Sequence, residues 1–178
     1  MKKILIYFFP LLFALSSSAQ VFNTSSTLKK AQFSAGFEPG VYVSGGTSFD
    51  LFLHGGAGIT QGVDLGLKLG VGNQFYFGGD VEFMLSRRFS VAAGAHAYGD
   101  FGLDFTGLFT LPLGSSADLY SGLDADVNFH PGSISVPLWI PLGLEIPIRK
   151  YILFYFETEI NITPAGSHFI GGGLNFLF

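Results

Sequence analysis

Apolar and polar residues alternate along most of the chain. Between positions 62 and 71 every odd residue is Val or Leu, whereas every even residue is Gly, Asp or Lys. Successive side chains of a β-strand point to opposite faces, so this stretch predicts a strand with one apolar face. The pattern recurs and predicts ten strands. They span residues 32–43, 48–59, 62–71, 76–86, 88–98, 101–111, 116–127, 135–148, 150–160 and 168–178.

Short connections with turn residues separate these strands, as in Ser44-Gly45-Gly46 and His130-Pro131-Gly132. No segment of the sequence reads as a helix. The predicted strands have about 10 to 14 residues each, which is enough because a tilted strand needs about 9 to 11 to cross a bilayer. Eight strands are the alternative, and in that case residues 32–59 would not span.

The composition decides between a soluble and a membrane β-protein. Hydrophobic residues make up 48% of the chain and charged residues only 12%. The polar face of the strands is rich in Gly, and so few charges would not cover a soluble β-sandwich. An open sheet in lipid would leave the hydrogen-bonding groups of its edges unpaired. We therefore predict an all-β fold, a closed antiparallel transmembrane β-barrel whose apolar side faces outward.

The N-terminus has the pattern of a signal peptide. Lys2 and Lys3 precede an apolar run of about a dozen residues, and Ser17-Ser18-Ala19 supplies small residues for cleavage. A retained anchor is the alternative, but this run is too short to span a bilayer as a helix. We expect a signal peptide at 1–19, a flexible periplasmic lead-in at 20–31 and the barrel at 32–178.

The C-terminus carries a second signal. Gly173, Phe176 and the terminal Phe178 have the form Gly-x-x-aromatic-x-aromatic. This motif resembles the assembly signal on the last strand of outer-membrane barrels. The chain thus resembles the small single-chain bacterial outer-membrane β-barrel proteins, a porin-like class. The resemblance implies location in the outer membrane, contact with its lipid, recognition by the barrel-assembly machinery and a last strand that ends in the periplasm.

The alternation places every acid except Asp100 on the inward face. Six of them fall in the outward half of their strands and form a predicted acidic vestibule: Asp50, Asp104, Asp124, Asp126, Glu157 and Glu159. The predicted inward bases are Lys68 and Arg88. Unpaired charges are very costly in a dry interior, so either water and cations enter or several acids are protonated. Rings of acids favour cations.

These residues favour a narrow, cation-preferring pore with an acidic lumen, open to cations or small solutes. The first alternative is a non-conducting structural or accessory subunit of an outer-membrane complex, in which the acids only keep the mouth hydrated. The net charge of −4 and the lack of a basic face make nucleic acid an unexpected partner.

A second alternative is a lipid-handling barrel with a lateral opening. Pro137 and Pro141 lie in one strand at positions of equal parity, so both remove an N–H group from the same seam. A simple strand kink is the other interpretation. The seam would be weakened unless a bulge shifts the register.

Catalytic residues, metals and cofactors are not predicted. The chain has no Cys and no Asp-x-Asp-x-Asp-Gly loop. His96 is expected to face Asp104 across a hairpin, an arrangement that is more often a structural ion pair. Ser90 lies about 20 Å from His96 along the strand and cannot complete a triad with it.

Overall fold

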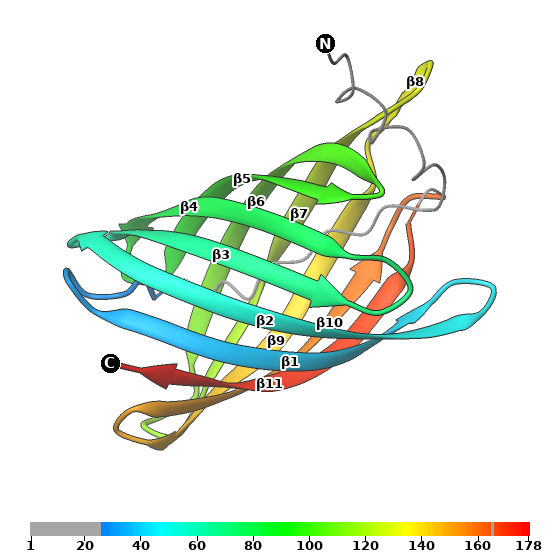
Figure 1. The fold of residues 1–178 in the computed structure, drawn as a ribbon. Coiled ribbons are helices and arrows are strands. Elements are labelled where there is room, and N and C mark those ends of the chain that lie inside the picture. The colour runs from blue at the N-terminus through cyan, green and yellow to red at the C-terminus, as the bar shows by residue number, and fades with distance from the viewer. Residues whose placement is uncertain (1–25, 165) are drawn as a thin grey trace, which may run out of the picture.

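The predicted strands form and close into a barrel (Figure 1). The computed structural model describes residues 26–164 and 166–178. Its strands are β1 (Phe33–Val43), β2 (Thr47–Thr60), β3 (Val63–Val71), β4 (Tyr76–Ser86), β5 (Phe89–Tyr98), β6 (Asp100–Pro112), β7 (Asp118–His130), β8 (Ser133–Ser135), β9 (Leu138–Arg149), β10 (Ile152–Asn161) and β11 (His168–Leu177). None of these described residues forms a helix long and apolar enough to cross a membrane.

Every strand pairs antiparallel with its neighbours, and all strands except the short β8 have a partner on both sides. Consecutive strands pair from β1 to β7, β9 pairs with both β7 and β10, and β11 returns to β1. The short β8 pairs with β7 beyond the end of β9, so β8 and β9 share one position in the wall. The closed all-β barrel with ten strand positions is confirmed, and the eight-strand alternative is wrong.

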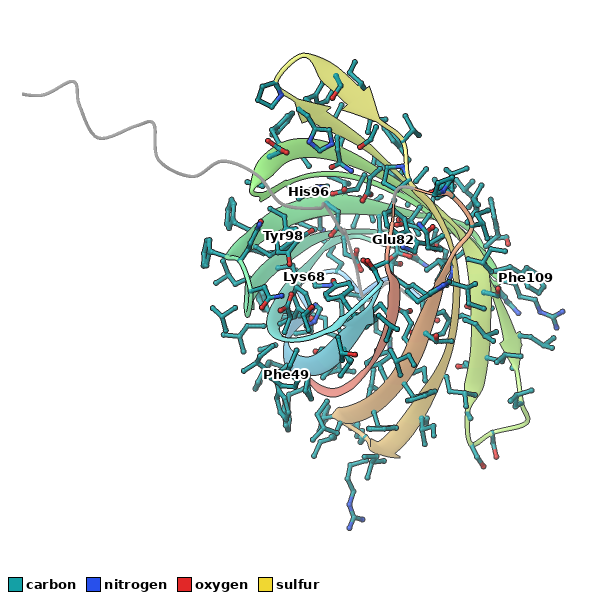
Figure 2. All side chains as sticks on the ribbon, turned by 90° about the vertical axis from the view of Figure 1, so that its right-hand side faces the viewer. Phe49, Lys68, Glu82, His96, Tyr98 and Phe109 are labelled. Atoms are coloured by element: carbon teal, nitrogen blue, oxygen red, sulfur yellow. The ribbon has the colours of Figure 1, made fainter. Side chains whose placement is uncertain are left out.

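The outer surface is apolar. Odd positions of β1 to β7 and even positions of β9 to β11 carry exposed Phe, Leu, Ile and Val side chains. Figure 2 shows Phe49 and Phe109 projecting outward, whereas Lys68 points into the barrel. Among the described residues, exposed Lys and Arg are confined to one end, and no Asp or Glu is exposed. The exposed bases are Lys29, Lys30, Arg87, Arg88, Arg149 and Lys150.

We call this end the C-terminal rim, because it holds Phe178 and the turns at 61–62, 87–88, 113–117 and 150–151. It lies at the left of Figure 1. The opposite rim holds the turns at 44–46, 72–75 and 131–132. An apolar band between two rims is the exterior that a lipid bilayer requires.

The predicted strand at 135–148 is interrupted. Val136 and Pro137 separate β8 from β9, although the register with β7 is the same on both sides: Asn128 faces Ser135 and Ala125 faces Leu138. Proline has no N–H group to donate to the ladder, which explains the break. The Pro137 carbonyl still accepts a 3.2 Å hydrogen bond from the Asp126 N–H.

Residues 26–32, most of which belong to the expected lead-in, fold against the C-terminal rim. The Leu28 N–H donates to Asp64 Oδ2 over 2.7 Å, and the Ala31 N–H donates to the Gly58 carbonyl over 2.9 Å. The alternation pattern does not predict these contacts. The predicted signal peptide at 1–19 lies outside the described residues, as do positions 20–25.

Replacing Leu67 by Arg tests whether the band faces lipid. Leu67 is mid-strand and 49% exposed, and Leu113 is 47% exposed at the C-terminal rim. We expect Leu67→Arg to lower the free energy of unfolding in lipid vesicles by about 2–4 kcal/mol and Leu113→Arg by about 0–1 kcal/mol. Urea titration of the refolded variants measures both. Equal, small effects would contradict a lipid-facing exterior, because exposed substitutions in water are nearly neutral.

Candidate functional site

The six predicted vestibule acids all lie inside the barrel. Their exposed fractions run from 0% for Asp126 to 5% for Asp124. Four further acids are also buried, and the complete set is Glu38, Asp50, Asp64, Asp80, Glu82, Asp104, Asp124, Asp126, Glu157 and Glu159. The sequence led us to expect the six around a hydrated mouth. They are instead covered by neighbouring side chains.

Lys68 is the central counter-charge of this interior. Its Nζ lies 3.8 Å from Glu38 Oε2, and His54 Nε2 approaches the same oxygen to 3.1 Å. The ammonium also sits 4.3 Å from the centroid of the Phe52 ring, a cation–π contact. Lys68 and His96 are the only basic side chains buried within the part of the chain that the structure describes.

The placement of Arg88 in the lumen is wrong. Arg88 is exposed in the turn between β4 and β5 at the C-terminal rim. The register shifts between Met84 and Ser86, and β5 begins only at Phe89. The alternation of inward and outward side chains therefore does not extend through this turn. The Arg88 guanidinium is solvated at the rim.

An aromatic cluster fills the lumen toward the opposite rim. Tyr42, Phe52, Tyr76, Tyr98 and Phe169 are buried together. The Tyr42 and Phe169 centroids are 4.9 Å apart, and the Tyr98 hydroxyl donates to Asp50 Oδ2 over 3.2 Å. Our sequence reading did not single out Phe52 and Phe169. The alternation pattern could have identified them, because both occupy inward positions of their strands.

A cavity of about 250 Å³ lies in the half of the lumen nearer the C-terminal rim. Its ionisable lining comprises Asp64, Asp80, Glu82 and Glu145, with Lys68 and His54 toward the centre of the barrel. The lead-in residues Ser26, Thr27 and Leu28 also line it. The interior thus combines an acidic cavity on one side with a packed aromatic layer on the other.

The expected contact between His96 and Asp104 is confirmed. His96 Nδ1 contacts Asp104 Oδ1, and His96 Nε2 lies 3.1 Å from Asn128 Oδ1. The imidazole stacks on Tyr76 with 5.7 Å between centroids. Because both ring nitrogens have partners, neither is directed at a hydroxyl group that it could activate. Asp126 joins this group, and His96, Asp104 and Asp126 each offer a ligand atom within 4.8 Å of the others.

The predicted seam lies between β7 and β9. Ser121 faces Leu142 and Asp124 faces Trp139, but the two intervening positions, which include Pro141, are not paired. The register is equal on both sides, so no bulge relieves the missing donor. The Ser121 hydroxyl donates to the Pro141 carbonyl over 2.9 Å. The wall is thus interrupted at both prolines of the predicted seam.

The residues of the C-terminal motif lie on and just beyond β11. Gly173 is buried on the inward face, whereas Phe176 pairs with Ala35 of β1 and Ile152 of β10. Phe178 exchanges backbone hydrogen bonds with Phe33 and is exposed. Its exposed ring lies at the rim, where another protein could reach it.

Comparisons with known proteins identify the fold. The KdgM porin superposes with a TM-score of 0.50 at 11% identity, over 80% of this chain and 99% of that chain. The translocator domain of the autotransporter NalP from Neisseria meningitidis gives a TM-score of 0.50 at 8% identity, over 83% and 88% of the two chains. No protein-family model and no curated protein matches the sequence. The chain has the fold of the small single-chain bacterial outer-membrane β-barrels.

Replacing Lys68 by Met tests its role as a counter-charge. Removing one partner of a buried ion pair leaves the other uncompensated, so we expect Lys68→Met to lower the free energy of unfolding by on the order of 3 kcal/mol. Adding Glu38→Gln should restore most of this loss. Fluorescence of the single Trp, Trp139, reports unfolding in urea.

The matched control is Lys150→Met at the exposed rim, for which we expect a change below about 0.5 kcal/mol. If Lys68→Met were as stable as the parent protein, the Lys68–Glu38 contact would not hold the interior together.

Proposed function

We propose that this chain is an integral β-barrel of the bacterial outer membrane and a narrow pathway that prefers cations to anions. In this proposal a cleaved signal peptide directs export, and the barrel-assembly machinery reads Gly173, Phe176 and Phe178 on the last strand. The neighbouring structures support the barrel itself, whereas the pathway rests on the chemistry of the interior.

The observation that carries the proposal is the charge imbalance inside the barrel. Among the residues that the structure describes, ten buried carboxyl groups face two buried bases, Lys68 and His96. Carboxylates in a low-dielectric wall create a negative potential that attracts cations and repels anions. The cavity of about 250 Å³ beside Asp64, Asp80 and Glu82 offers room for water and a cation near the C-terminal rim.

The aromatic cluster sets the width of this pathway. Passage between the cavity and the opposite rim requires movement of side chains such as Tyr76 and Phe169, because both are fully buried by their neighbours. This packing predicts small, intermittent conductance. The same packing favours the first alternative, a non-conducting structural or accessory barrel. An enzymatic role is not part of this proposal, because both nitrogens of His96 already contact other side chains.

Conductance in a planar bilayer distinguishes these functions. With a KCl gradient across the membrane, we expect the mature protein to give a cation-selective reversal potential. Neutralising Asp124, Asp126, Glu157 and Glu159 as amides should lower both the conductance and the selectivity. Asp100→Asn is the control, because Asp100 lies at the opposite rim outside this set. A folded barrel without conductance would refute the pore and favour the non-conducting barrel.

A second candidate function rests on the seam. The ladder between β7 and β9 is interrupted at Pro137 and Pro141, so this seam has fewer hydrogen bonds holding it closed than its neighbours. An apolar molecule could pass there between the lumen and the bilayer. Transient opening would place the buried Asp124 and Asp126 beside the gap, so the polar end of such a molecule would meet carboxyl groups.

Disulfide locking tests lateral passage. The common register places Leu123 opposite Ile140 on the outer face of the seam, and the chain has no Cys of its own. We expect Leu123→Cys with Ile140→Cys to abolish uptake of a fluorescent fatty acid from vesicles, with recovery on reduction. The control lock joins Leu103 to Val127, which face each other across the intact β6–β7 ladder. This function would be refuted if the parent protein took up no fatty acid. It would also be refuted if the disulfide between positions 123 and 140 left uptake unchanged.

A further inference from the structure

Three neighbouring strands bring two carboxylates and an imidazole to one buried point. Asp104 of β6 is the direct cross-strand partner of Asp126 of β7. His96 of β5 faces Gly102, which in turn faces Asn128. The glycine leaves room for the side chains on either side of it, because a Cβ at position 102 would lie 2.5 Å from Asn128 Oδ1. Figure 2 shows His96 on the inner side of the wall.

The charges of this group do not balance by themselves. Directly opposed like charges on neighbouring strands destabilise a sheet, and Asp104 and Asp126 are 3% and 0% exposed. A doubly protonated His96 supplies one positive charge against two carboxylates. A divalent cation bound by a neutral imidazole and both carboxylates would leave no net charge.

The hydrogen bond of His96 selects the tautomer that such a cation needs. His96 Nε2 lies 3.1 Å from Asn128 Oδ1, an acceptor, and an imidazole with its hydrogen on Nε2 makes this hydrogen bond. In the neutral ring the lone pair is then on Nδ1, on the side of Asp104. Metal-binding histidines commonly donate their other N–H to a carbonyl or carboxylate oxygen in this way. Stacking on Tyr76 fixes the plane of the ring.

We propose that His96 Nδ1, Asp104 and Asp126 bind a divalent transition-metal cation, with Zn²⁺ as the first candidate. One imidazole nitrogen with carboxylate oxygens is a ligand set that suits Zn²⁺, at about 2.0–2.2 Å from each ligand atom. The three ligand atoms lie within 4.8 Å of one another, so a small adjustment of side chains completes the set. This metal site would form whether or not the barrel conducts ions.

Metal binding by the folded barrel tests the proposal. The mature protein is refolded from urea into detergent micelles with Zn²⁺ present, so that access to a buried site is not limiting. We expect one tightly bound Zn²⁺ per barrel by elemental analysis after dialysis. A chromophoric chelator then competes for the metal. Affinity should fall at least tenfold in Asp126→Asn and in His96→Gln, and Zn²⁺ should raise the urea midpoint of the parent protein but not of these two variants.

The matched control is His130→Gln. His130 Nδ1 lies 2.5 Å from Asp100 Oδ2, so His130 also contacts a carboxylate. Neither His130 nor Asp100 belongs to the group of His96, Asp104 and Asp126. Affinity should be unchanged in this variant. Circular dichroism confirms that each variant is folded, and Asp126→Asn is nearly isosteric.

Two results would overturn the proposal. One is a parent barrel that retains no more Zn²⁺ than Asp126→Asn, which would make His96 and Asp104 an ion pair only. The other is retained Zn²⁺ that is lost in His130→Gln and kept in Asp126→Asn, which would place the metal elsewhere.

Discussion

Closure of the sheet by pairing of the first strand, β1, with the last, β11, is the constraint on which the rest of this barrel depends. A bilayer offers no hydrogen-bond partners, so each backbone N–H and C=O group in contact with lipid must be paired within the protein. The antiparallel ladders run around the whole wall and meet the requirement almost everywhere. Among the described strands, breaks that coincide with prolines lie between β7 and the β8–β9 position, at Pro137 and Pro141, and between β1 and β11, at Pro39.

Closure also divides the side chains into two environments. The outward positions are apolar because they face lipid, which leaves the lumen as the only place for polar groups in the middle of the barrel. The narrow bore then forces those groups together. Lys68 consequently touches both an acid and the Phe52 ring, while Asp104 and Asp126 face each other with His96 alongside. The interior is crowded with carboxyl groups, which attract cations.

The same crowding explains why the interior differs from a hydrated vestibule. Tyr42, Tyr76 and Phe169 pack together in the lumen toward the opposite rim. Residues 26–28 approach from the C-terminal rim and line the remaining cavity. A conducting state therefore requires rearrangement of side chains, whereas a metal held by His96, Asp104 and Asp126 requires the packing as it stands.

The sequence by itself determined the strands, their inner and outer faces and the contact between His96 and Asp104. These follow from a period of two and from a single tight hairpin, which are local properties. Alternation failed at Arg88, where a register shift and a turn interrupt it. Only the tertiary structure decided the assembly of His96, Asp104, Asp126 and Asn128, the burial of the acids beneath Phe52 and Phe169, and the docking of Leu28 on Asp64. The first depends on the register of the three consecutive strands β5, β6 and β7, because a one-residue change in pairing would move every side chain to the other face. The other two depend on contacts between segments that are far apart in the sequence.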